Sequence, residues 1–155
     1  MKRYVWVLVL VVLVLSALAC GSTAEGSDPA ETGSFRFTVL DAQRGEAVRE
    51  IVQEGNQFNT MPEPGQEYVM VTVRVECLQA ECSFSPYNLG VAGSENVVYE
   101  PEIVAGVDNS LESKQMLQGG ALEGKLFFLV QENETDLRLR WAALFGDAAY
   151  FPLDL

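Results

Sequence analysis

The chain has 155 residues, with 22 acidic side chains against 10 basic ones, three cysteines and no histidine. This length suits one small domain, because compact domains usually contain about 100 to 200 residues. The lack of histidine removes the usual general base of Ser and Cys hydrolases and the commonest ligand of catalytic zinc. The net charge of −12 argues against a nucleic-acid partner, because phosphate binding needs clustered Lys and Arg.

The first residues have the three-part layout of an export signal. Two basic residues precede an unbroken apolar run over 5–15, and the small residues Ala17 and Ala19 follow it. The uncharged stretch 4–19 is shorter than the ~20 residues that a membrane-spanning helix needs. We therefore predict a cleaved signal helix over 1–19, and an uncleaved anchor is the second choice.

Cys20 follows a small residue at the end of the apolar run and so resembles the lipobox of bacterial lipoproteins. In that family the thiol is diacylated and the cysteine becomes the first residue. The family usually has Leu where this chain has Ala17, so plain secretion after cleavage at Ala19 stays open. Lipidation would leave Cys77 and Cys82 as an even pair, and we predict Cys20 as a lipid anchor on the extracytoplasmic face of the cell membrane.

Residues 20–34 contain Gly, Ser, Thr, Ala, Pro and acids, and no large apolar residue. We predict a flexible tether, because such a segment cannot form a core. Thirteen or so residues give a root-mean-square reach of roughly 20 Å. Loss of the two basic residues of the leader changes the net charge to −14, and an anionic leaflet would repel that surface. The folded domain is then expected over 35–155, clear of the bilayer.

From Phe35 onward apolar and polar residues alternate with a period of two, which predicts strands with one buried face. The clearest run lies at 69–75, and its valines favour the extended conformation. A late run at 137–141 carries arginines on its opposite face. The residues expected to face a core from these strands are Phe35, Phe37, Val39, Val69, Val71, Val73, Val75, Leu137, Leu139 and Trp141.

Two segments depart from this alternation. Residues 126–130 are apolar on both faces, which predicts a central strand covered on both sides, or one whose outer face meets a loop. Residues 46–54 have apolar residues at helical spacing, over too few residues to decide. About seven short strands between turn signals predict an all-β fold, an immunoglobulin-like antiparallel β-sandwich. A closed barrel is the alternative.

One order of motifs runs through the domain: Phe-x-Phe-x-Val, a Pro-Gly step, a Val-rich strand ending near Cys77, a Gly-Gly step at Gly119, the segment 123–128 and a final Leu-x-Leu-x-Trp strand. This order resembles domain of unknown function 4352 over 35–155. The resemblance implies an immunoglobulin-like sandwich in an exported bacterial lipoprotein and no catalytic residues. The chain departs from the family pattern in having Cys77 where a strand-end Asn is usual.

Cys77 and Cys82 are separated by four residues. Strand residues five apart face opposite ways, so a bond between them requires a turn, and export supplies an oxidising compartment. For such a small loop, the chain-entropy formula predicts that a disulfide stabilises the fold by about 2 kcal/mol. A zinc site would need four ligands, and the chain has no histidine and no third available cysteine. A redox motif needs two residues between its cysteines, and this pair has four. We predict a structural disulfide, no metal site and no cofactor.

Acidic pairs and clusters are the other candidate sites. Glu100 and Glu102 would share a strand face roughly 7 Å apart, which lies in the range of an inverting glycosidase. Solvated charge is the simpler interpretation, because an acidic chain produces such pairs by chance and Pro101 indicates an edge or loop. Two clusters offer oxygen ligands for calcium, although turn chemistry also explains them. They are Asp108, Asn109, Ser110 and Glu112, and Glu132, Asn133, Glu134 and Asp136.

The expected function is a lipid-anchored extracytoplasmic module that binds a protein, peptide or envelope ligand through loops or a sheet face and has no catalytic activity. The alternative is a carboxylate-dependent hydrolase that acts on envelope glycans through residues such as Glu100 and Glu102. A structural envelope protein that binds copies of itself is a third possibility. Near the C-terminus, Phe145, Tyr150 and Phe151 are core residues or part of a binding patch, and the sequence leaves both open.

Overall fold

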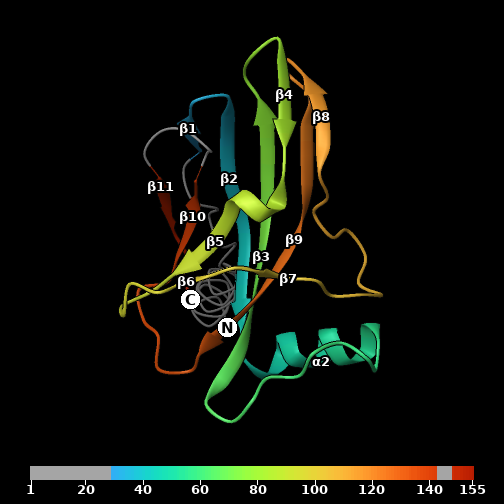
Figure 1. Ribbon diagram of the computed structural model, residues 1–155, viewed down its shortest axis with the longest axis vertical. Coiled ribbons are helices and arrows are strands. Elements are labelled where there is room, and N and C mark those ends of the chain that lie inside the picture. Colours follow the sequence, from blue (N-terminus) through green and yellow to red (C-terminus); the bar gives the residue numbers. More distant parts are fainter. Residues whose placement is uncertain (1–28, 143–147) are drawn as a thin grey trace, which may run out of the picture.

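Three long strands form the centre of the structure: β2 (Phe35–Arg44), β3 (Gln66–Cys77) and β9 (Ala121–Gln131) (Figure 1). The computed structural model describes residues 29–142 and 148–155. The central strands pair antiparallel, with β3 in the middle. Two short strands, β1 (Ala30–Thr32) and β7 (Pro101–Glu102), complete a five-stranded sheet in the order β1-β2-β3-β9-β7.

A second sheet has the order β11-β10-β5-β6, and a third consists of β4 and β8. Their bounds are β4 (Glu81–Phe84), β5 (Leu89–Ala92), β6 (Val98–Tyr99), β8 (Lys114–Leu117), β10 (Arg138–Trp141) and β11 (Ala149–Pro152), with the short 3-10 helix η1 (Pro86–Asn88) before β5. Each sheet of the described chain begins and ends on an edge strand, so none closes into a barrel. The structure is an all-β antiparallel sandwich, and the prediction of that fold class is confirmed.

The main core lies between the five-stranded and four-stranded sheets. The alternate valines of β3 are fully buried there, as the period of two predicts. The indole of Trp141 joins the sheets: its ring centroid lies 4.9 Å from that of Phe37, 5.3 Å from that of Phe35 and 5.9 Å from that of Phe84, on which it stacks. Aromatic pairs at these separations add stabilisation beyond the area they bury.

Helix α2 (Glu46–Gly55) covers the other face of the long strands at the end remote from the β4–β8 sheet (Figure 1). Val48 and Val52 are one helical turn apart and pack with Tyr68, Met70 and Phe127 in a second core. Strand β9 is therefore covered on both faces, as its two-sided apolar sequence predicts. The segment 46–54, which its spacing alone left undecided, is a helix because these apolar strand residues provide a surface for its buried stripe.

The folded domain begins before the boundary expected at Phe35. Strand β1 pairs with β2 through the register Ala30 to Phe37 and Thr32 to Phe35, and Gly33 makes the turn with a φ of 56°. Backbone hydrogen bonds hold this strand, so it needs no large apolar side chain. The predicted tether 20–34 thus differs from the structure at its C-terminal end.

The remaining N-terminal predictions lie outside the described residues. They include the signal helix 1–19, the lipidation site Cys20 and most of the tether. Within 29–142 and 148–155, no helix has the length and apolar character needed to span a bilayer.

Hydrogen bonds of Asn59 join the end of α2 to the segment that follows β7, and we call this set of bonds the Asn59 clasp. The Asn59 amide donates to Val52 O at 2.8 Å and to Ala105 O at 3.0 Å, while its Oδ1 accepts from Ala105 N–H at 2.9 Å. Gly106 has a φ of 75°, and a Cβ on it would lie 2.0 Å from Gly55 O. Only glycine permits this close approach, which fixes the 103–108 loop against the helix.

We expect Gly106→Ala to lower the free energy of unfolding by about 3 kcal/mol, because it adds a backbone collision to the cost of a left-handed residue. Gly119→Ala is the matched control, since Gly119 has a φ of 79° and open space around it. This control should lose only about 1 kcal/mol. Urea denaturation followed by circular dichroism measures both free energies of unfolding. Equal losses in the two variants would contradict a stabilising role for the close approach of Gly106 to Gly55.

Candidate functional site

A cleft of about 560 Å³ lies where β7 and the loops around it meet the edge of β9. Its volume falls in the range of about 300 to 1,000 Å³ that is typical of ligand pockets. The lining residues come from η1, β7, the 103–112 segment and the middle of β9. They are Pro86, Tyr87, Pro101, Glu102, Ile103, Val104, Val107, Asp108, Asn109, Ser110, Leu111, Glu112, Lys125, Leu126 and Phe127.

Two segments that both bond to the same edge of β9 build the cleft. Strand β7 pairs with Phe127 and Phe128. Nearer the start of β9, Lys125 N–H donates to Asn109 O at 2.7 Å, and Leu111 N–H donates to Lys125 O at 2.9 Å. The chain between these anchor points must leave the sheet, and Lys125, Leu126 and Phe127 of β9 line the hollow beside it.

The rim of the cleft combines exposed apolar side chains with carboxylates. Tyr87 is 64% exposed and Ile103 is 79% exposed, although both side chains are large and apolar. Glu102, Asp108 and Glu112 are exposed around them, and among the described lining residues these carboxylates outnumber the cationic side chains, of which Lys125 is the one member. Exposed apolar groups within a polar rim are typical of interaction sites.

The two carboxylates of the hydrolase hypothesis differ in their relation to the cleft. Glu102 lines the cleft and Glu100 does not, and both are exposed. The first acidic cluster, at 108–112, lines the same cleft. Among the described residues, no group of three or more His, Cys, Asp or Glu side chains is placed to hold a metal ion. Sequence reasoning found these acids but missed the cleft, because the pairing that builds it joins segments far apart in the chain.

Glu134, from the second acidic cluster, has an inward position that the turn interpretation did not predict. Its side chain is only 1% exposed. Its carboxylate accepts hydrogen bonds from Ser94 Oγ at 3.0 Å, from Glu95 N–H at 3.2 Å and from Tyr99 Oη at 3.0 Å. It thereby fastens the turn between β5 and β6 to the turn between β9 and β10, and so joins the two large sheets.

Two opposing effects set the pKa of Glu134. Burial raises it, whereas the hydrogen bonds from Glu95, Ser94 and Tyr99 lower it, and the net effect is a pKa below the ordinary glutamate value. The carboxylate is therefore ionised in the native protein at neutral pH, and its role is structural.

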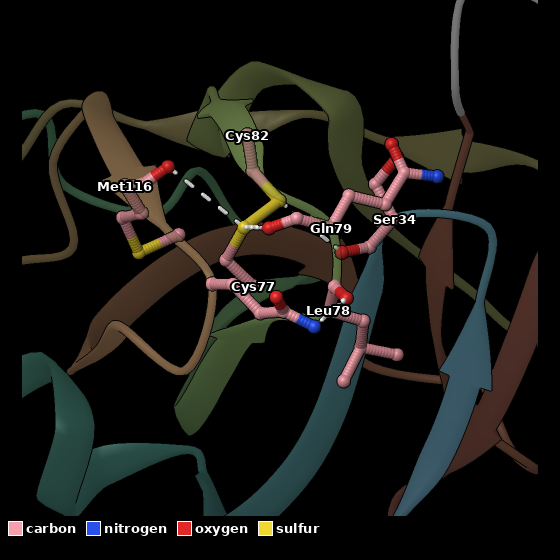
Figure 2. Close-up of a disulfide and its surroundings, with 7 residues drawn as sticks. Ser34, Cys77, Leu78, Gln79, Cys82 and Met116 are labelled. Carbon is pink, nitrogen blue, oxygen red and sulfur yellow. Dashed lines mark hydrogen bonds between the residues drawn. A yellow bond between two sulfur atoms is a disulfide. The ribbon is translucent and has the colours of Figure 1, made fainter.

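Cys77, at the end of β3, and Cys82, in β4, are joined by a disulfide with a Cα–Cα distance of 5.9 Å (Figure 2). Both residues are buried. Cys82 Sγ lies 3.3 Å from Ser34 O, and Cys77 Sγ lies 3.8 Å from Met116 O in β8. The bridge thus links the five-stranded sheet to the β4–β8 sheet, and it lies apart from the cleft lining.

The C-terminal aromatic residues divide between core and surface. Phe151 is 4% exposed and packs on Phe37 with ring centroids 5.5 Å apart. Tyr150, its neighbour in β11, faces outward and is 48% exposed. Phe145 lies outside the described residues.

We expect Glu134→Gln to destabilise the domain by roughly 1–3 kcal/mol at neutral pH, because an amide N–H₂ would face groups that donate hydrogen bonds. A native pKa below the unfolded value gives stability that is present above the unfolded pKa and is lost as the pH falls toward the native one. The difference between wild type and variant should therefore shrink below about pH 4.5. Urea denaturation across pH measures it, with the exposed neighbour Glu132→Gln as the control. A difference that does not change with pH would contradict this role.

Comparison with solved structures supports the fold. A proposed lipoprotein of Bacillus subtilis, ycdA, superposes with a TM-score of 0.65 at 13% identity over 84% of this chain and 39% of its own. The chain thus spans less than half the length of that protein. The yjhA protein of Bacillus subtilis superposes with a TM-score of 0.59 at 12% identity, over 82% of this chain and 96% of its own. The secreted protein MPT63 of Mycobacterium tuberculosis superposes with a TM-score of 0.57 at 12% identity, over 85% of this chain and 95% of its own.

At these identities the similarities establish the fold alone. No curated protein matches the chain. The model of the family described as Domain of unknown function (DUF4352) matches residues 25–150, which is most of the sequence, and the chain belongs to this family.

Proposed function

We propose that this domain is a non-catalytic, immunoglobulin-like binding module of the cell envelope, and that its ligand occupies the cleft between β7 and the 107–112 segment. The cleft carries the proposal because it combines a suitable volume with apolar side chains left in solvent. Its walls are fixed by backbone pairing to β9 and by the Asn59 clasp. A wall held in this way loses little entropy on binding.

The side chains of the cleft favour a ligand that is apolar in part and positively charged in part. Tyr87 and Ile103 offer apolar surface, and Glu102, Asp108 and Glu112 offer negative charge. Opposite charge on the ligand gains attraction from this rim and from the net charge of the whole protein. A basic, apolar peptide segment satisfies both requirements.

We also propose that Cys20 anchors the domain to the outer face of the cell membrane, with secretion as the outcome if Cys20 is not lipidated. The lipobox-like sequence supports this location, and so does the similarity to a proposed lipoprotein and to a secreted protein. Two or three acyl chains would hold the domain firmly, because one chain alone binds only marginally.

The cleft is tested with a fluorescent peptide in which Lys alternates with Leu. The triple variant Glu102→Gln/Asp108→Asn/Glu112→Gln should weaken binding about tenfold, because each exposed charge contributes up to about 1 kcal/mol. Ile103→Ser should also weaken it severalfold without a change of charge. Fluorescence anisotropy of the full chain in uncharged detergent measures these affinities.

The matched control for charge is Glu81→Gln/Glu123→Gln/Asp154→Asn, which removes the same number of carboxylates outside the cleft lining. Equal weakening by both triple variants would mean that binding is general attraction to an acidic surface, and the cleft proposal would fail. Turnover of envelope glycans or esters by the full chain, abolished by Glu102→Gln, would favour the hydrolase instead.

Cys20→Ala tests the anchor. We expect the wild-type protein in the membrane fraction and the variant in the medium, because the variant lacks the thiol that receives the lipid. Cell fractionation and immunoblotting measure the distribution. If the distribution does not change, the protein is held by something other than a lipid on Cys20.

A further inference from the structure

The arginines of this acidic domain fall into two groups. Those of the five-stranded sheet and helix α2 all lie within ion-pair distance of glutamate carboxylates: Arg36 of Glu31 and Glu76, Arg44 of Glu67, Arg49 of Glu46, and Arg74 of Glu123. The two arginines of the four-stranded sheet, Arg138 and Arg140, have no such pair with any carboxylate of residues 29–142 and 148–155. In a protein with more than twice as many acids as bases, this difference needs an explanation.

Arg138 and Arg140 share the outer face of β10. Their neighbours Leu139 and Trp141 point into the main core, so the arginines point away from it. Alternate residues of a strand are about 7 Å apart along its axis. In register with the arginines, the flanking strand β5 has the small residues Gly90 and Ala92, and both of these are buried. The two arginines are half-buried, so each presents part of its side chain to solvent.

Tyr150 of β11 extends this face and orients one of its cations. The guanidinium carbon of Arg138 lies 5.3 Å from the centroid of the Tyr150 ring, a cation–π contact. The contact holds the guanidinium over the edge strand of the sheet. Arg138 Nε is buried and has no hydrogen-bond partner among the described residues. We call the group of Arg138, Arg140 and Tyr150 the basic face.

We propose that the basic face is a second docking surface, separate from the cleft, and that it binds an acidic, extended peptide segment of a partner protein. The guanidinium fork matches a carboxylate in geometry and bonds it at two points. Alternate side chains of an extended peptide repeat at the same distance of about 7 Å as the two arginines, because both chains are extended. A peptide with acids at alternate positions can therefore meet both cations at once, while the exposed Tyr150 ring packs against an intervening side chain.

The probe is a fluorescent peptide in which Glu alternates with Ser, added to the full chain in uncharged detergent at about 0.15 M salt. We expect saturable binding that weakens as salt rises, and at least a tenfold loss in Arg138→Gln/Arg140→Gln. The control Arg49→Gln/Arg74→Gln removes the same charge from helix α2 and the other sheet, and it should bind like wild type. Tyr150→Ala should weaken binding severalfold without a change of charge.

Several outcomes would overturn the proposal. They are no saturable binding of the Glu–Ser peptide, equal losses in the two arginine variants, or binding of inorganic polyphosphate in place of the peptide. Far-ultraviolet circular dichroism and the urea midpoint check that each variant is folded. The cleft variants should bind the Glu–Ser peptide at least as tightly as wild type does, because they keep the basic face and the triple variant also loses negative charge, so this surface and the cleft can fail independently.

Discussion

A strand that is apolar on both faces needs two covers, and β9 imposes this constraint on the whole domain. One face carries Leu126, Phe128 and Val130 into the main core, which the four-stranded sheet closes. The other carries Phe127 into the second core, which helix α2 closes together with the segment after β7. If one of the two covers were missing, large apolar side chains on that face of the central sheet would remain in water, at a cost of about 25 cal/mol for each Å² exposed.

The two covers differ in completeness. The four-stranded sheet covers its face broadly, and its Trp141 packs directly on the aromatic residues of β2. The second cover is pieced together from one helix, a two-residue strand and a loop, and it leaves the cleft beside Lys125 and Phe127. The candidate binding site is thus a consequence of how the second face of β9 is closed.

Charge is distributed unevenly over this scaffold. Carboxylates surround the cleft, and the arginines that pair with no carboxylate of the described residues lie on the outer face of the other sheet. Glu134 is unlike the other acids of 29–142 and 148–155 because it is buried, and its hydrogen bonds hold the two large sheets together at one end. The total charge is therefore less informative about partners than the location of each charge.

Much of the fold follows from local sequence patterns, and the site does not. The valines of 69–75 and the two-sided run of β9 predict the sheet, its buried faces and the need for a second cover. Strand β1 was missed because backbone pairing at Ala30 requires no apolar side chain. Glu134 resembled a turn residue because its partners Ser94 and Tyr99 are distant in sequence. The cleft was missed for the same reason, since it depends on where β7 and the 109–111 segment meet β9.

Photocrosslinking in the intact envelope tests the central claim, that the incomplete second cover of β9 is the ligand site. A photoreactive amino acid replaces Ile103, at the rim of the cleft, or Leu117 in β8, which is 72% exposed and lies outside the lining. The account predicts a discrete adduct from position 103 and none from position 117. Adducts from position 117 alone, or equally from both, would contradict it.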